Sequence, residues 1–301
     1  MKLPSRPPIS PRVALFIGVL FMSWSAIFIK LAAAPVLIIA FYRMFFAVVL
    51  LTPEMALRRM PRVSRRDLLL MIASGILLAA HFAAWIAALK RTNVAVAVVL
   101  VNTHPLFVAI LAWLFLRERL SPKAVFWMIL TVLATGALSF GDFAAGQSRV
   151  IGNLLAIAGA VLVSGYLIIG RLLRRGISAR VYVYIVYAAS TGTLLVGCLA
   201  TGAPLFGHPG SDYLWFLGLA LFPTLLGHSI FNWALGHLKT SVVATAILGE
   251  PVFATVLSLI ILGERPETAT IVFGPVLLYA IYRFVRAETP ETPETYLDTP
   301  T

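Results

Sequence analysis

Apolar residues follow one another along this chain in long runs. Asp, Glu, Lys and Arg are absent from residues 13–29, 68–89, 92–116, 124–141, 150–170, 181–211 and 213–238. Three further apolar runs, 35–57, 240–262 and 268–285, include Arg43, Glu250 and Arg283, respectively. A helix needs about 20 mostly apolar residues to cross the hydrocarbon core of a bilayer. The pattern therefore predicts ten membrane-spanning helices, over about 13–33, 35–57, 68–88, 93–116, 122–141, 152–172, 181–201, 213–235, 240–262 and 268–285.

The predicted fold class is an all-α integral membrane protein. A membrane β-barrel would alternate apolar and polar residues, whereas these runs are continuous. Of the 301 residues, 60% are hydrophobic and 12% are charged, against about 25% charged residues in a soluble domain. The single cysteine, Cys198, excludes an internal disulfide framework and a cysteine-rich metal site. Composition thus excludes a soluble globular enzyme, a secreted disulfide scaffold and a disordered chain, and no cofactor is predicted.

The basic residues predict the orientation of the helices. With the N-terminus inside, the inner segments hold 18 of the 24 Lys and Arg residues, the outer loops hold 5, and Arg43 lies within a span. Basic residues concentrate on the cytoplasmic side of membrane proteins, so both termini are predicted to be cytoplasmic. We interpret two arginine clusters as orientation signals, in preference to binding sites for anionic lipid or nucleic acid: Arg58, Arg59, Arg62, Arg65 and Arg66, and Arg171, Arg174, Arg175 and Arg180.

The chain divides into four predicted segments. Residues 1–12 are basic and proline-rich, and the first apolar run lacks a signal-peptide cleavage site, so we expect that run to remain as an anchor. Residues 13–141 and 152–286 each hold five spans, and the acidic, proline-containing tail 287–301 is predicted to be disordered.

The two five-span halves carry a matching sequence. Residues 105–119 (PLFVAILAWLFLRER) and 251–265 (PVFATVLSLIILGER) share Pro, Phe, two Leu, Glu and Arg at an offset of 146. Because five is odd, the second half enters the membrane from the opposite side. The sequence therefore predicts an inverted repeat, an arrangement that carriers use for alternating access to a central site.

Several short motifs resemble the drug/metabolite transporter superfamily, specifically its EamA type with ten helices and two repeats, the architecture of YddG-type exporters. The resemblance covers about residues 12–286 and rests on Ser23-Trp24-Ser25, Phe41-Tyr42-Arg43, Gly249-Glu250-Pro251-Val252-Phe253 and the paired ends Arg117-Glu118-Arg119-Leu120 and Gly263-Glu264-Arg265. It implies a transporter of the bacterial inner membrane that does not hydrolyse ATP. Most often, such a protein exports amino acids or related metabolites.

Glu250 is the lead candidate for a functional residue, because it alone of the twelve acidic residues falls in the middle of a predicted span. A charged side chain at the bilayer centre costs about 2.5–3.5 kcal/mol on insertion scales. Glu250 is predicted to bind a cationic or amine group, or to carry a proton. The structural alternative is an acid paired with His228, Arg43 or a backbone amide near Pro251.

Two prolines fall at equivalent positions of the repeat. Pro251 follows Glu250 and Pro105 follows His104, and each removes a backbone donor from a predicted span. Paired helix breaks are the best sequence indication of a transporter site. His104 can titrate near neutral pH, so it is a candidate for substrate binding or proton coupling, with a neutral core histidine as the alternative.

Other polar residues inside the spans complete the predicted site. His81 and Trp85, like His228 and Asn232, are four residues apart on one helix face, so each pair could line a cavity or bond to a neighbouring helix. Trp24, Asn102 and Tyr166 are predicted pocket walls, the alternative being packing or interface anchoring.

Arg43 lies nine residues into its span, about 12 Å deep at 1.5 Å per residue. It could bind a substrate carboxylate through two parallel hydrogen bonds, or extend to the outer interface. With Glu250 it would suit a zwitterion. Glu118 and Glu264 stand beside arginines at span ends, where a local salt bridge or a contact that braces the loop is the better interpretation.

Motifs of other protein classes are missing. The sequence holds no H-E-x-x-H, G-x-S-x-G or P-loop pattern, and no ring of like groups indicates a channel. We therefore predict a secondary transporter of a small organic metabolite, with amino acids or related compounds first and organic cations, nucleoside-like compounds or vitamins as alternatives. Coupling to protons is an open option. The expected partners are lipid and substrate but no nucleic acid, with a monomer or weak dimer.

Overall fold

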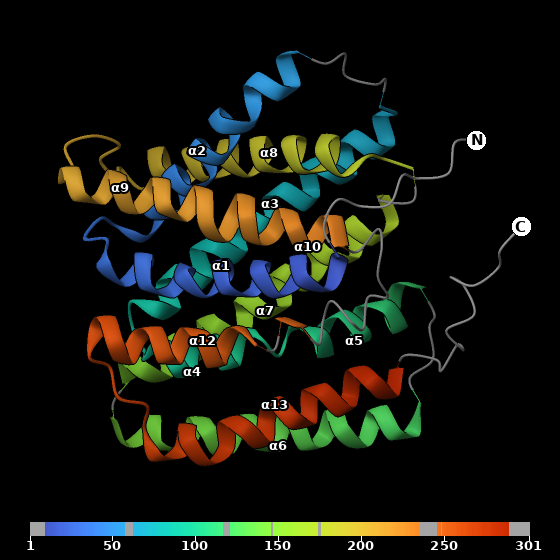
Figure 1. The fold of residues 1–301 in the computed structure, drawn as a ribbon, viewed down its shortest axis with the longest axis vertical. Helices are drawn as coiled ribbons and strands as arrows, with labels where there is room; N and C mark the ends of the chain where they lie inside the picture. Colours follow the sequence, from blue (N-terminus) through green and yellow to red (C-terminus); the bar gives the residue numbers. More distant parts are fainter. Residues whose placement is uncertain are drawn as a thin grey trace, which may run out of the picture.

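The computed structural model describes residues 10–57, 63–116, 121–145, 147–173, 176–234, 246–247 and 249–288. Every regular element in these ranges is helical (Figure 1). The helices are α1 Pro11–Leu31, α2 Val36–Ala56, α3 Arg65–Leu89, α4 Val94–Val101, α5 His104–Leu116, α6 Pro122–Ala145, α7 Gln147–Leu173, α8 Ala179–Ala200, α9 Gly210–Leu219, η1 Ala220–His228, α10 Ser229–Ala234, α12 Glu250–Leu257, η2 Ser258–Leu262 and α13 Thr268–Glu288.

Each of the ten predicted spans contains a described helix. Seven helical stretches are long and apolar enough to cross a membrane, and the shorter apolar helices Pro122–Thr135, Glu250–Leu262 and Thr268–Phe284 occupy the other three spans. This confirms the predicted all-helical membrane fold. The predictions for Glu118, Arg58, Arg59, Arg62, Arg174, Arg175, residues 1–9 and most of the tail lie outside the described residues.

Two boundaries differ from the prediction. The loop expected between the halves, near residues 142–151, is largely helical, because α6 continues to Ala145 and α7 begins at Gln147. Polar residues such as Asp142 and Arg149 end the apolar pattern without ending the helix, since a helix can extend beyond the hydrocarbon core. Span 213–235 is also not a single α-helix, because residues Ala220–His228 form a wider π-helix.

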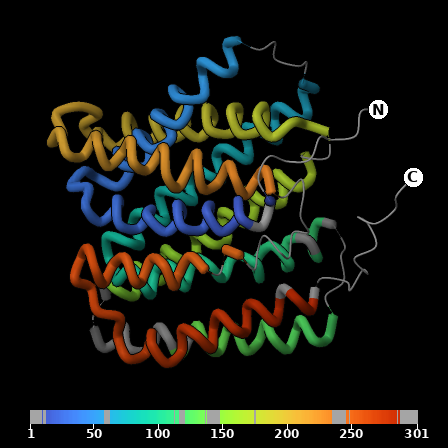
Figure 2. The backbone as a smooth tube through the Cα atoms, viewed as in Figure 1, coloured from blue at the N-terminus to red at the C-terminus, as the bar shows by residue number. Residues whose placement is uncertain are grey.

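The helices pack side by side in an elongated bundle (Figure 1). α2, α3 and α8 pack together toward one end, and α6 and α13 pair at the other. α1 lies between them, against η1 on one side and α12 on the other. The tube in Figure 2 shows that α1 begins and α13 ends at the same side of the bundle.

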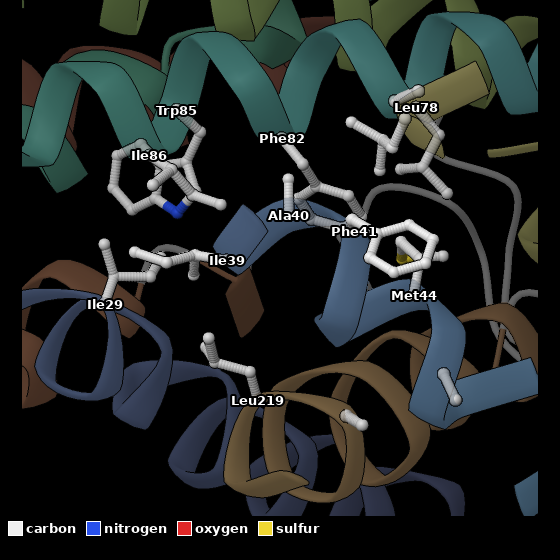
Figure 3. Packing of buried hydrophobic residues seen from close by; sticks show 14 of the residues in the cluster. Ile29, Ile39, Ala40, Phe41, Met44, Leu78, Phe82, Trp85, Ile86 and Leu219 are labelled. Carbon is white, nitrogen blue, oxygen red and sulfur yellow. The ribbon is translucent and has the colours of Figure 1, made fainter. Parts of the chain in front are cut away.

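The largest apolar core joins α1, α2, α3 and α9. Figure 3 shows Trp85 among Ile29, Ile39 and Ile86, with Leu219 facing them from below. All five side chains are buried. The core therefore fixes the relative positions of the helices that carry the polar residues described next.

A helix begins beside each of the two prolines that predict a helix break. α4 ends at Val101, Asn102 and Thr103 form a turn, and α5 begins at His104. In the second half, the turn residue Gly249 precedes α12, which begins at Glu250 with Pro251 in its first turn. Because a proline fits the first turn of a helix but not its interior, each break places its neighbouring polar residue at a helix start.

Candidate functional site

Arg43 of α2 is buried within the bundle, with 1% of its surface exposed. Its Nε donates to Thr224 Oγ1 (2.8 Å) and one Nη donates to Ser25 Oγ (3.1 Å). The guanidinium lies 4.0 Å from the centre of the Phe82 ring, a cation–π arrangement. The side chain thus does not extend to the membrane interface, and no described acidic residue forms an ion pair with it.

The position of Thr224 follows from its neighbour Pro223. Pro223 has no amide hydrogen, so the Leu219 carbonyl loses the partner that an α-helix would supply. The wider turn of η1 brings Thr224 to that carbonyl, and Thr224 Oγ1 donates to it (2.8 Å). With its proton committed to Leu219, the Thr224 hydroxyl oxygen accepts from Arg43 Nε.

Glu250 is the first residue of α12, and 7% of its surface is exposed. Asn102 and Arg43 lie close enough to act on its charge, but no ion pair joins Glu250 to a described residue. Its carboxylate sits at a helix N-terminus, where the helix dipole favours negative charge. The Ser23 hydroxyl approaches its backbone carbonyl at 3.5 Å.

Three histidines lie around these two charges. His81 Nδ1 bonds to the Gly159 carbonyl of α7 (2.8 Å), and the His228 ring lies edge-on to Phe82 at 5.9 Å. His104 lies close to the backbone of Val101, whose carbonyl Pro105 leaves without an amide partner. All three rings lie within electrostatic range of one another. We call Arg43, His81, Asn102, His104, His228 and Glu250 the central polar cluster.

Asn232 and Tyr166 lie beside this cluster. Asn232 Nδ2 donates to Tyr166 Oη (3.2 Å) and to the His228 carbonyl (2.9 Å). The first bond joins α10 to α7, so Asn232 also connects two helices. No three described His, Cys, Asp or Glu residues form a group suited to a metal ion.

The two predicted pocket tryptophans pack against apolar and aromatic side chains. Trp85 is part of the apolar core, and Trp24 stacks on Phe28 with ring centres 5.5 Å apart. Phe28 in turn stacks on Trp215 of α9 at 5.9 Å. Both tryptophans therefore have packing partners in this structure, and a role in substrate binding stays a prediction.

Sequence reasoning did not select three residues that border the cluster. Ser25 and Thr224 hold the guanidinium, and Tyr187 of α8 lies within electrostatic range of it. Pro223 in the middle of a predicted span was an available signal for Thr224. No local pattern marks Tyr187, because its position depends on how α8 packs against α2 and α3.

A second polar region joins the helix ends where α1 meets α2 and α3 meets α4, the predicted outer end. Lys30 pairs with Glu264 (3.0 Å) and also donates to the Thr92 carbonyl (3.0 Å). The other Glu264 oxygen accepts from the Val94 amide at the start of α4 (3.0 Å). The local bridge predicted for Glu264 is thus wrong in its partner, which comes from a distant helix. Gly263, with φ 68°, permits the turn that directs Glu264 there.

Comparison with known proteins identifies the class of the molecule. The sequence model of the EamA-like transporter family matches residues 11–140 and 150–286. The chain is 27% identical to the pseudopaline exporter CntI of Pseudomonas aeruginosa over 229 residues, covering 75% of this chain and 78% of the exporter. It is 23% identical to an uncharacterized transporter of Archaeoglobus fulgidus over 268 residues, covering 89% and 93%.

A solved crystal structure has the same fold, with a TM-score of 0.65 over 93% of this chain and 99% of the other at 19% identity. Two family matches over nearly the whole chain, together with the helical membrane fold, lead to one conclusion: this protein belongs to the EamA-like transporter family.

Proposed function

We propose that this protein is a secondary transporter that exports small zwitterionic metabolites, amino acids or related compounds, across the bacterial inner membrane. One observation carries the proposal. Arg43 and Glu250 are both buried at the centre of the bundle, act on each other electrostatically, and form no ion pair with each other. Leaving opposite buried charges apart is costly, so a ligand that contacts both is the physical reason we assign to them.

The chemistry of the two groups suits a zwitterion. A guanidinium donates to carboxylates with favourable geometry, and a carboxylate accepts from an ammonium group. Neutral hydroxyls hold Arg43, so its charge stays available to a ligand. The P. aeruginosa relative is named as a pseudopaline exporter, which supports export of an organic metabolite. Organic cations, nucleoside-like compounds and vitamins are the alternative substrates.

For the mechanism we propose alternating access between two inverted five-helix halves, residues 13–141 and 152–286, with both termini in the cytoplasm. The starts of α5 beside Pro105 and of α12 beside Pro251 support this arrangement, because broken helices line the binding sites of many inverted-repeat carriers. Within it, Glu250 or His104 would carry the proton if transport is coupled to protons.

A thermal-stability screen of the purified protein tests the substrate class. A ligand that binds the folded state raises the melting temperature by mass action. We expect amino acids or related zwitterions to raise it, and Glu250→Gln and Arg43→Ala to remove the effect. A response to organic cations or nucleosides alone would contradict the proposal.

Counterflow in proteoliposomes then separates a carrier from a channel or an enzyme. A carrier loaded with unlabelled substrate accumulates labelled substrate transiently against its gradient, and the flux saturates. A flux that rises linearly with concentration would indicate a pore, and chemical conversion of the substrate would indicate an enzyme.

A further inference from the structure

Tyr187 carries a buried hydroxyl group that lacks a hydrogen-bond partner among the described residues. Only 1% of its side chain is exposed. Ser229 lies close enough to act on this hydroxyl but outside hydrogen-bond geometry, and its own hydroxyl donates to the Thr224 carbonyl (3.4 Å). A buried hydroxyl without a partner destabilises the folded protein, because it has given up its hydrogen bonds to water. Its presence in the core therefore needs a reason.

Tyr182, on the same helix, shows what a structural tyrosine looks like in this bundle. It is also 1% exposed. Its hydroxyl bonds to Ser74 Oγ of α3 at 2.8 Å and approaches the Tyr166 carbonyl of α7 at 3.5 Å. Two tyrosines of equal burial, five positions apart on α8, thus differ in whether the hydroxyl is satisfied.

The surroundings of Tyr187 indicate what the missing partner is. Arg43 and Tyr166 lie within electrostatic range of its hydroxyl. Arg43 offers only donors, and so cannot accept a hydrogen bond from Tyr187. A group that accepts from both a guanidinium and a phenol in a buried position is an anion, and a carboxylate has enough lone pairs to do so.

The opposite end of the cluster has a matching unsatisfied acceptor. Asn102 Nδ2 donates to the Val98 carbonyl (2.9 Å), while its Oδ1 is buried without a partner among the described residues. Asn102 adjoins Glu250. The unsatisfied donor therefore lies near the positive charge and the unsatisfied acceptor near the negative charge, which is the arrangement that a bound zwitterion would complete.

We infer that Tyr187 is a substrate-binding residue, whose hydroxyl donates to the carboxylate held by Arg43 and so selects acids over the corresponding amides and amines. Asn102 Oδ1 accepts from the substrate's ammonium group beside Glu250. This inference rests on the proposed function, and it adds the residues that form hydrogen bonds with each end of the substrate.

The first test needs no ligand. Tyr187→Phe removes a hydroxyl that has no hydrogen-bond partner among the described residues, so we expect the melting temperature of this variant to equal or exceed that of the wild type. Tyr182→Phe is the matched control, and we expect it to melt lower because Ser74 loses its partner. A loss of stability in Tyr187→Phe as large as in Tyr182→Phe would overturn the inference, because the hydroxyl would then have a structural partner.

The second test measures discrimination. The purified proteins are titrated with amino acids, their carboxamides and the matching decarboxylated amines, with the melting temperature as readout. We expect the wild type to prefer the acids, and Tyr187→Phe to bind them about tenfold more weakly, as loss of one charge-assisted bond predicts. Affinity for the amides and amines should change little, and Tyr182→Phe should keep the wild-type ratio.

The outcomes separate the two claims. If the wild type binds amino acids and Tyr187→Phe retains the same preference for acids over amides, the inference fails while the proposed function stands. If no acid or other zwitterion stabilises the wild type, the proposed function fails, and the inference fails with it.

Discussion

The central polar cluster and the predicted outer end each bring an acidic side chain near a basic one from another helix, but only at the outer end do the two form an ion pair. At the outer end, Lys30 and Glu264 form an ion pair of 3.0 Å, and Glu264 also accepts from the Val94 amide and the Ser258 hydroxyl. In the cluster, Arg43 and Glu250 influence each other without direct contact.

Exposure makes this contrast informative. The side chains of Lys30 and Glu264 are 21% and 25% exposed, whereas Arg43 and Glu250 are almost completely buried. Water can solvate the outer pair, so an ion pair there is a modest stabiliser. Leaving a buried charge without its partner costs far more free energy. The more deeply buried pair is nevertheless the one left apart, which supports our proposal that the cluster binds a ligand while the outer end serves the structure.

Among the substitutions that test this difference between the two regions, we expect Glu250→Gln to have the largest effect. We expect it to abolish transport in proteoliposomes while the melting temperature stays within a few degrees of the wild type, because a neutral amide fills the same space without a desolvation cost. Glu264→Gln is the control on the other region, and it should retain transport. Equal transport rates for Glu250→Gln and the wild type would contradict the central role that we propose for this residue.

Arg43→Lys should show the next largest effect, at least a tenfold loss of affinity for a carboxylate ligand. Lysine keeps the positive charge but lacks the planar guanidinium. The guanidinium can donate to Thr224 and Ser25 and still offer further N–H groups to an anion. Thermal shift with a titrated amino acid measures this loss. An unchanged affinity would mean that the guanidinium serves packing against Phe82 alone.

Thr224→Val should lower the free energy of unfolding by about 2 kcal/mol, because the Leu219 carbonyl and Arg43 Nε both lose a buried partner. Thr224→Ser keeps the hydroxyl and should stay near the wild type. Denaturant or thermal unfolding in detergent compares the two variants. Similar losses in both would point to the methyl group, and would contradict the assigned hydrogen bonds.

The smallest expected effect belongs to the outer end. Lys30→Ala should destabilise the protein by about 1 kcal/mol or less, and raised salt should narrow its difference from the wild type, because partly exposed ion pairs are screened. Melting curves at low and high salt measure it. A large loss that does not depend on salt would show that Lys30 acts mainly through its bond to the Thr92 carbonyl.

Much of the fold followed from local sequence. Runs of about 20 apolar residues predict spans without reference to any other part of the chain, and α5 and α12 begin beside Pro105 and Pro251, the two prolines that predict helix breaks. The π-helix of residues 220–228 was missed, although Pro223 was visible, because the response of a helix to proline depends on which side chain reaches the freed carbonyl.

The candidate site was only partly accessible from the sequence. Glu250 stood out because an acid inside an apolar span is rare, and Arg43 and the histidines for similar reasons. Their assembly into one cluster, the packing partners of Trp24 and Trp85, and the position of Tyr187 depended on contacts between distant helices. The same holds for Glu264, whose partner Lys30 lies more than 200 positions away.

The sequence by itself determined the membrane-spanning helices and the chemistry buried within them, because hydrophobicity and proline act locally along the chain. Only the tertiary structure decided which buried charges are satisfied and which are not. Hydrogen bonds and ion pairs act over a few ångströms in space, and the packing of α1, α2, α7, α8 and α12 sets those distances.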